Sequence, residues 1–146
     1  RRSGWQVPML VTASGYTAQV PQLGGAAMEG LYAVALVPQP DPDGANRALA
    51  DWIARYREKF RVEPNTWDVY TWVGADLFVR ALHAAGPQPT PQKVAAALER
   101  LQTTRDFFGS QPITLSPSNH LALGQVRVAQ IRKGRWENVT DYLPIR

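Results

Sequence analysis

Three prolines at alternate positions divide this chain into two unlike parts. Residues 38–44 (PQPDPDG) cannot be helical, because each proline lacks a backbone N–H and has a fixed φ angle. The sequence is strand-like before this segment and helical after it. Stiff, proline-rich segments are typical of spacers, so we expect the chain to cross from one structural unit to another here.

Two apolar stretches precede the proline segment. Residues 7–13 (VPMLVTA) end at Ser14-Gly15, and residues 30–37 (GLYAVALV) end at the first proline. Short apolar runs bounded by Gly, Ser or Pro predict buried strands. Residues 16–28 contain a proline and a Gly-Gly pair, which predict a short or broken helix.

Three helices are expected after the prolines. Residues 47–60 carry apolar side chains at helical spacing, which predicts an amphipathic helix. Residues 67–85 are apolar on nearly every side, which predicts a central, buried helix. Thr90-Pro91 has the pattern of an N-cap followed by proline at the first helical position, so a third helix begins there.

The C-terminal tail is expected to form strands. Residues 112–115 and 125–132 are strand-like, and Lys133-Gly134 predicts a tight turn that leads into residues 135–139. This hairpin is expected on the surface, with its basic side chains in water: Arg127, Arg132, Lys133 and Arg135. Together these elements predict an α/β protein with parallel strands and too few strands for so apolar a central helix.

Composition excludes several classes of function. The 146 residues have the length of one domain, and 45% of them are hydrophobic, as in globular proteins. The chain has no cysteine, which excludes disulfides, thiolate metal sites and cysteine nucleophiles. A net charge of +4 is modest, and the basic residues around Tyr56 and Phe60 predict a solvated helix face. We therefore expect no nucleic-acid partner.

Catalytic and cofactor patterns are also missing. His83 and His120 have no partner at metal-ligand spacing, and structural roles are the better interpretation of both. No phosphate-binding loop, dinucleotide fingerprint or nucleophile elbow occurs. We expect no metal, no cofactor and no enzyme activity, although an α/β enzyme that uses His120 or Glu29 stays an alternative.

Small-ligand binding has more support from the residues. Ser14, Gly15 and Tyr16 follow an apolar strand, where ligands bind in parallel sheets. Glu29 is the one charged residue between Arg2 and Asp41, and a carboxylate in apolar surroundings needs a partner. That partner is either a ligand ammonium or a group of the protein, and the residues alone do not decide. Trp67 either covers a ligand or packs in the core.

Six motifs, in order along the chain, resemble those of the type I periplasmic binding proteins, the leucine/isoleucine/valine-binding receptors of branched-chain amino acid ABC transporters. They are residues 27–32 (AMEGLY), 56–60 (YREKF), 63–67 (EPNTW), 94–101 (VAAALERL), 113–120 (ITLSPSNH) and 126–136 (VRVAQIRKGRW). The resemblance covers nearly the whole chain.

The resemblance implies a two-lobed α/β fold that closes on a small solute and delivers it to membrane permeases. Glu29 matches an acidic residue that pairs with the ligand ammonium, Trp67 matches an aromatic of the facing lobe, and residues 14–16 match a loop that faces the cleft. The implied location is periplasmic or extracellular, with a lipid or surface anchor possible in principle. A ligand-sensing regulatory domain of the same fold is the alternative.

The resemblance also explains the shortage of strands. It implies that the chain is the C-terminal portion of the fold, with residues 1–45 in the C-terminal lobe, residues 46–120 packed on the N-terminal lobe, and residues 121–146 back in the C-terminal lobe. Apolar side chains of the central helix would then lack a sheet to pack on. We expect either the missing N-terminal part of the same protein or a homo-oligomer to cover them.

Overall fold

The computed structural model describes residue 4 and residues 7–145, so Arg1, which opens the predicted first segment, lies outside the described residues. The described residues contain one open sheet of five strands flanked by helices. The strands are β1 (Leu10–Val11), β2 (Tyr32–Ala35), β3 (Gln125–Arg132), β4 (Arg135–Asn138) and β5 (Leu143–Pro144). This is a mixed α/β architecture, as the sequence predicts.

The sheet has the order β1-β2-β3-β4, and β5 pairs with the start of β3. Leu10 lies opposite Tyr32 in the parallel pair of β1 and β2, whereas β2–β3 and β3–β4 are antiparallel. The predicted hairpin is confirmed, because β3 and β4 pair in antiparallel register around Lys133-Gly134. Its surface placement is wrong for β3, which is a central strand of the sheet. Ala129 and Ile131 of β3 are completely buried, since their side chains point to the covered face and alternate with outward ones.

Six helical segments accompany the sheet in the described part of the chain. They are η1 (Ala13–Gly15), α1 (Gln19–Gly24), η2 (Gly25–Met28), α2 (Arg47–Phe60), α3 (Thr66–Ala85) and α4 (Pro91–Leu98). The three long helices begin where the sequence predicts, because each has a local N-cap. Asn46 caps α2, Asn65 and Asp68 form a capping box at α3, and the Thr90 hydroxyl accepts from the backbone N–H of Lys93 at α4.

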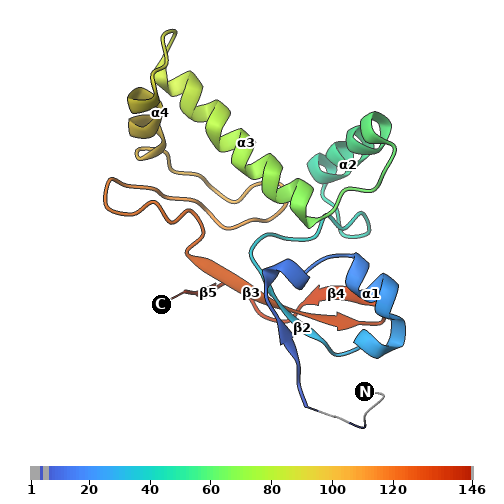
Figure 1. The fold of residues 1–146 in the computed structure, drawn as a ribbon. Coiled ribbons are helices and arrows are strands. Elements are labelled where there is room, and N and C mark those ends of the chain that lie inside the picture. Colours follow the sequence, from blue (N-terminus) through green and yellow to red (C-terminus); the bar gives the residue numbers. More distant parts are fainter. Residues whose placement is uncertain (1–3, 5–6, 146) are drawn as a thin grey trace.

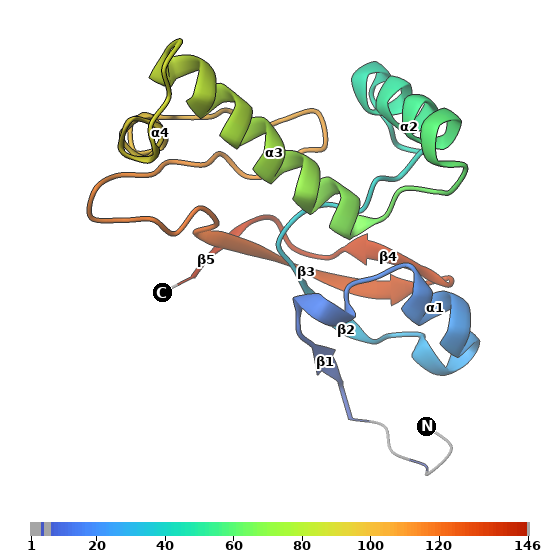
Figure 2. The ribbon, with the colours of Figure 1, turned by 45° about the horizontal axis from the view of Figure 1, so that its top comes forward.

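The molecule consists of two parts joined by two connections (Figures 1 and 2). The sheet part comprises residues 7–37 and 125–145, and the helical part comprises residues 45–120 with α2, α3 and α4. Residues 38–44 form one connection, as the prolines predict, and residues 121–124 form the other. The assignment of these parts to the lobes of a larger fold stays a prediction.

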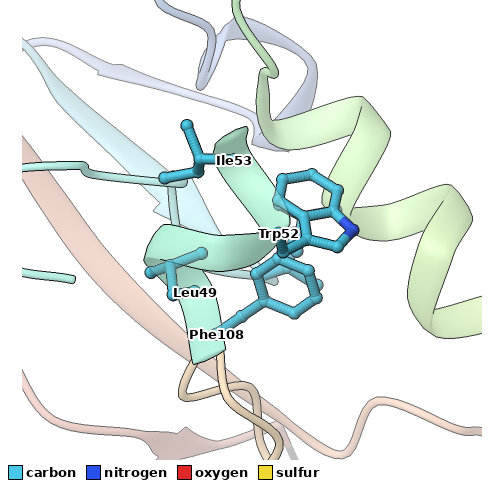
Figure 3. Close-up of a cluster of buried hydrophobic side chains, with 6 residues drawn as sticks. Leu49, Trp52, Ile53 and Phe108 are labelled. Carbon is cyan, nitrogen blue, oxygen red and sulfur yellow. The ribbon is translucent and has the colours of Figure 1, made fainter. Parts of the chain in front are cut away.

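Each part has its own apolar cluster. In the helical part, Trp52 of α2 meets the Phe108 ring edge to face, with 4.9 Å between ring centroids (Figure 3). This cluster consists of Leu49, Trp52, Ile53, Val69 and Phe108 of the helical part, together with Val37 from the end of the sheet part. In the sheet part, Tyr16 packs on the small side chains of Ala33, Ala35 and Ala129. Burial of such side chains is worth about 1.5–3 kcal/mol for each large one.

Two expectations about the helical part differ from the structure. Helix α3 is not buried on nearly every side: Tyr70, Phe78 and Val79 are about half exposed, because no sheet of the described chain lies against them. Residues 112–115 form no ladder, and Thr114 makes only an isolated bridge with Gln102. Leu10 of β1, expected to be buried, is also exposed.

Among the described residues, none of the helices is both long enough and apolar enough for a membrane crossing.

Candidate ligand-binding site

Ser14 and Gly15 form a tight turn directly after β1. They lie in η1, in which the Gly15 N–H donates to the Thr12 carbonyl at 2.9 Å. A Cβ atom at position 15 would approach Val11 Cγ2 to 2.7 Å, so glycine lets the turn fold back against the strand. Ser14 is exposed on this turn.

Tyr16 anchors this turn to the sheet. Its residue is only 3% exposed, and its ring meets the Trp136 ring edge to face at 5.4 Å. Burial raises the pKa of the Tyr16 phenol to about 12, so the phenol is neutral at physiological pH. The Tyr16 carbonyl accepts a hydrogen bond from Gln39 Nε2, which ties the turn to the proline segment. The buried Tyr16 side chain thus holds the Ser14 turn against the sheet.

Trp67 lies in the first turn of α3, the end of the helix that is nearest the sheet part (Figures 1 and 2). Its backbone N–H donates to Asn65 Oδ1 at 2.8 Å, which fixes the start of the helix. The residue is 48% exposed, and its ring meets Tyr70 with 6.3 Å between centroids. Trp67 therefore presents an open aromatic surface rather than filling the core.

Glu29 follows η2 and holds the turn between β3 and β4. Its two carboxylate oxygens accept hydrogen bonds from the backbone N–H groups of Lys133, at 2.8 Å, and Gly134, at 3.2 Å. Both turn residues have positive φ angles, 51° and 75°, as a two-residue hairpin turn requires. The two adjacent N–H groups form a small anion-binding concavity, which the carboxylate fills.

The structure does not bring Glu29 and Ser14 together. The register pairs Leu10 with Tyr32 and Val11 with Ala33 in parallel. Ser14 follows the carboxyl end of β1, whereas Glu29 precedes the amino end of β2, so the two lie at opposite ends of this strand pair. The alternative in which Glu29 braces a loop against backbone amides describes the observed contacts. Its role toward a ligand stays a prediction.

Glu29→Gln separates these two interpretations. The amide keeps one acceptor oxygen but loses the charge, so we expect the free energy of unfolding to fall by about 1 kcal/mol. The exchange of the Lys133 and Gly134 amide protons should become faster, which NMR hydrogen exchange measures. Glu137→Gln, an exposed carboxylate on β4, is the matched control and should change neither quantity. Loss of amino-acid binding with unchanged exchange would instead favour the ammonium-pairing role.

A cavity of about 350 Å³ lies between the two parts of the molecule. It is lined by α1, the proline segment, the α2–α3 turn and β4. The ion pair of Arg135 and Asp43, 2.6 Å apart, joins two of its walls. None of Ser14, Gly15, Tyr16, Glu29 and Trp67 lines this cavity.

Arg127 is a residue that sequence reasoning misplaced. We expected its side chain in water, but that side chain is only 18% exposed, and its Nε has no hydrogen-bond partner among the described residues. Arg127 shares a face of β3 with the buried Ala129 and Ile131. The two-residue period of the strand contained this signal, because Arg127 is two residues from Ala129 and four from Ile131.

The charged groups form no metal site in the described part of the chain. No three His, Asp or Glu side chains lie close enough there to hold a metal ion. His120 Nε2 lies 3.1 Å from Glu99 Oε1 in an exposed pair. This pair lies in the helical part, outside the region of the Ser14 turn.

Comparison with known proteins identifies the family. The sequence model described as "Periplasmic binding protein" matches residues 1–135. A search of curated proteins finds no match. Several solved structures have the same fold as this chain. One is a leucine-binding protein from Thermotoga maritima, which is 20% identical to this chain in sequence, has a TM-score of 0.72 and covers 96% of this chain.

Two further solved structures have the same fold. A branched-chain amino acid ABC transporter protein from Thermus thermophilus, with bound valine, is 18% identical, has a TM-score of 0.82 and covers 99% of this chain. A solute-binding protein of an ABC transporter from R. palustris, in complex with benzoate, is 17% identical, has a TM-score of 0.69 and covers 95% of this chain.

The chain spans 38% of the Thermotoga protein, 41% of the Thermus protein and 38% of the R. palustris protein. It thus corresponds to about two fifths of the length of these structures, with the type I fold that the motifs predict. Proteins of this family are solute-binding receptors, and the family implies a periplasmic or extracellular location. The chain belongs to the periplasmic binding protein family.

Proposed function

We propose that the chain is part of the solute-binding receptor of an ABC importer. The receptor binds a small polar or amphipathic molecule, such as an amino acid or an aromatic acid, between two lobes. The observation that carries the proposal is the pair of open groups on the two parts of the molecule, the Ser14 turn after β1 and Trp67 at the start of α3. Valine or benzoate bound to proteins of the same fold supports this ligand class.

Each group has a distinct chemical role in this proposal. The Ser14 hydroxyl binds a polar group of the solute, and the Trp67 ring covers its apolar part. Clefts of this kind combine apolar walls with a few well-placed polar groups. Tyr16 and Gly15 act through the shape of the turn, because the phenol is buried and glycine allows the close approach to Val11. Binding involves no covalent step.

The partners follow from the same proposal. The loaded receptor docks on the permease subunits of its importer at the membrane, in the periplasm or at the cell surface, with or without a lipid anchor. The half-exposed apolar side chains of α3, including Phe78 and Val79, are covered by the N-terminal part of the same protein or by a second copy of the chain.

Native mass spectrometry of the intact protein that contains this sequence tests the proposal. We expect a co-purified small molecule, or binding of at least one of leucine, valine and benzoate, by a complex that contains a second lobe. A solute at 100 times its Kd should raise the free energy of unfolding by about 2.7 kcal/mol. Absence of any co-purified solute, together with no thermal shift for the three compounds, would contradict the proposal.

A further inference from the structure

Tyr142 lies at the junction between the sheet part and the helical part, with two arginines beside its ring. The Arg127 guanidinium carbon is 4.1 Å from the ring centroid, and that of Arg105 is 5.2 Å away. The phenol oxygen donates a hydrogen bond to the Gly109 carbonyl at 2.9 Å. Cations bind favourably at the face of an aromatic ring. The two arginines and the hydrogen bond to Gly109 therefore hold the Tyr142 ring through three separate contacts.

Asp141 completes the cluster with its negative charge. One of its carboxylate oxygens lies 3.4 Å from Arg127 Nη2 and 3.7 Å from Arg105 Nη2. The backbone N–H of Tyr142 donates to the same oxygen at 2.8 Å. This N–H, together with the two guanidinium groups, holds the pKa of Asp141 below its ordinary value. The carboxylate is therefore charged at neutral pH and pairs with both arginines.

The members of the cluster come from both parts of the molecule. Arg105 and Gly109 flank Phe107 and Phe108, whose rings pack on Trp72 of α3 in the helical part. Arg127 is on β3, and Asp141 and Tyr142 follow β4 in the sheet part. The cluster thus joins the two parts by noncovalent contacts, and none of its residues belongs to the two connecting segments, residues 38–44 and 121–124.

A second polar contact crosses the junction beside the cluster. Gln125 at the start of β3 donates its backbone N–H to Gln111 Oε1 at 2.8 Å, and its carbonyl accepts from Gln111 Nε2. These paired bonds fix where residues 105–111 meet the sheet. Tyr142 and Asp141 reach across the junction with their side chains, which contact the Gly109 carbonyl and Arg105 of the helical part.

We propose that Asp141 and Tyr142 act as a clamp that sets the angle between the sheet part and the helical part. The clamp holds Arg105 and the Gly109 carbonyl of one part against Arg127 of the other. Because the Ser14 turn and Trp67 lie on different parts, this angle also sets the width of the proposed ligand cleft. That last consequence rests on the proposed function, whereas the clamp itself does not.

Distances between two spin labels test the clamp in the intact protein. The 146 residues contain no cysteine, and any cysteine elsewhere in the intact protein is first replaced by serine. Introduced cysteines at Gln92 of α4 and Asn138 of β4, both exposed, then place one label on each part. Tyr142→Ala should broaden the distance distribution at least about twofold, since two parts released from a clamp sample more orientations. Tyr142→Phe, which removes only the bond to Gly109, should broaden it less.

Two further variants keep the test decisive. Asp141→Asn removes the charge that pairs with both arginines and should also broaden the distribution. Tyr70→Phe removes a phenol oxygen from a half-exposed tyrosine of α3, outside the junction, and should leave the distribution unchanged. If Tyr142→Ala does not fold, as circular dichroism shows, then Tyr142→Phe and Asp141→Asn decide the question.

An unchanged distribution in every folded clamp variant would overturn the proposal. Broadening without any solute bound in the mass-spectrometric screen would support the clamp while the proposed function fails. Broadening accompanied by weaker binding of an identified solute would support both, because the clamp then also sets the cleft.

Discussion

Trp52→Ala is expected to lower the free energy of unfolding by about 3–5 kcal/mol, the usual cost of removing a large buried aromatic side chain. Trp52 is 8% exposed and lies among Leu49, Val69 and Phe108. This cluster joins α2 to α3 and to residues 107–108. Urea unfolding followed by circular dichroism measures the change.

Trp67→Ala is the matched control for stability, because it makes the same chemical change at a residue that is 48% exposed. We expect it to lower the free energy of unfolding by no more than about 1 kcal/mol, since exposed substitutions leave no cavity. Equal losses for the two variants would mean that the cluster around Trp52 does not hold the helical part together.

Trp67→Ala is expected to weaken binding of the solute identified by mass spectrometry by about tenfold or more, since an aromatic anchor often contributes at least about 1.4 kcal/mol. Removal of the ring deletes the apolar cover that we propose for the ligand, while the fold remains. Isothermal titration calorimetry on the intact protein measures the change in Kd.

Phe78→Ala provides the control for this binding effect. Phe78 is also on α3 and is 52% exposed, but it lies three turns further from the end that faces the sheet part. Its removal should leave the Kd unchanged. Equal affinity of the wild type and the Trp67→Ala variant would exclude Trp67 from the ligand site.

The helices could be predicted from the sequence because their signals are local. Asn46, Asn65 and Thr90 each precede a periodic segment, and the structure begins a helix after each of them. Each cap side chain accepts from a backbone N–H only two or three residues away. Residues that make such short-range contacts are neighbours in the sequence, so the sequence pattern alone predicts where each helix begins.

The sheet was harder to predict because its partners are far apart in the chain. Nothing near residues 125–132 indicates that β2 lies beside them, so the hairpin was expected at the surface. The pairing with β2 decides which face of β3 is buried. Arg127 lies opposite Ala35 and Ala129 lies opposite Ala33, and this face of β3 is on the covered side of the sheet. Periodicity gives two faces of a strand, and only the neighbouring elements decide which of them is buried.

The candidate site was predictable in part. Ser14 could be identified as a polar group that follows a strand, and the structure leaves it exposed. The residues left open whether Trp67 packs in the core or covers a ligand, and the structure leaves Trp67 48% exposed. The partner of Glu29 could not be predicted, because it is a pair of backbone amides more than a hundred residues away. Backbone groups carry no sequence signal.

The pairing of β2 with β3 has a consequence for how the chain acquires its structure. Gly30 and Ala33 contact residues 129–131 across most of the sequence, whereas α3 and α4 contact each other locally. Contacts between distant residues form slowly because a long loop must close first. During synthesis the helical part can therefore form while residues 7–37 still lack their partner. The edge of β2 that pairs with β3 is then unpaired and open to association with other chains until β3 has left the ribosome.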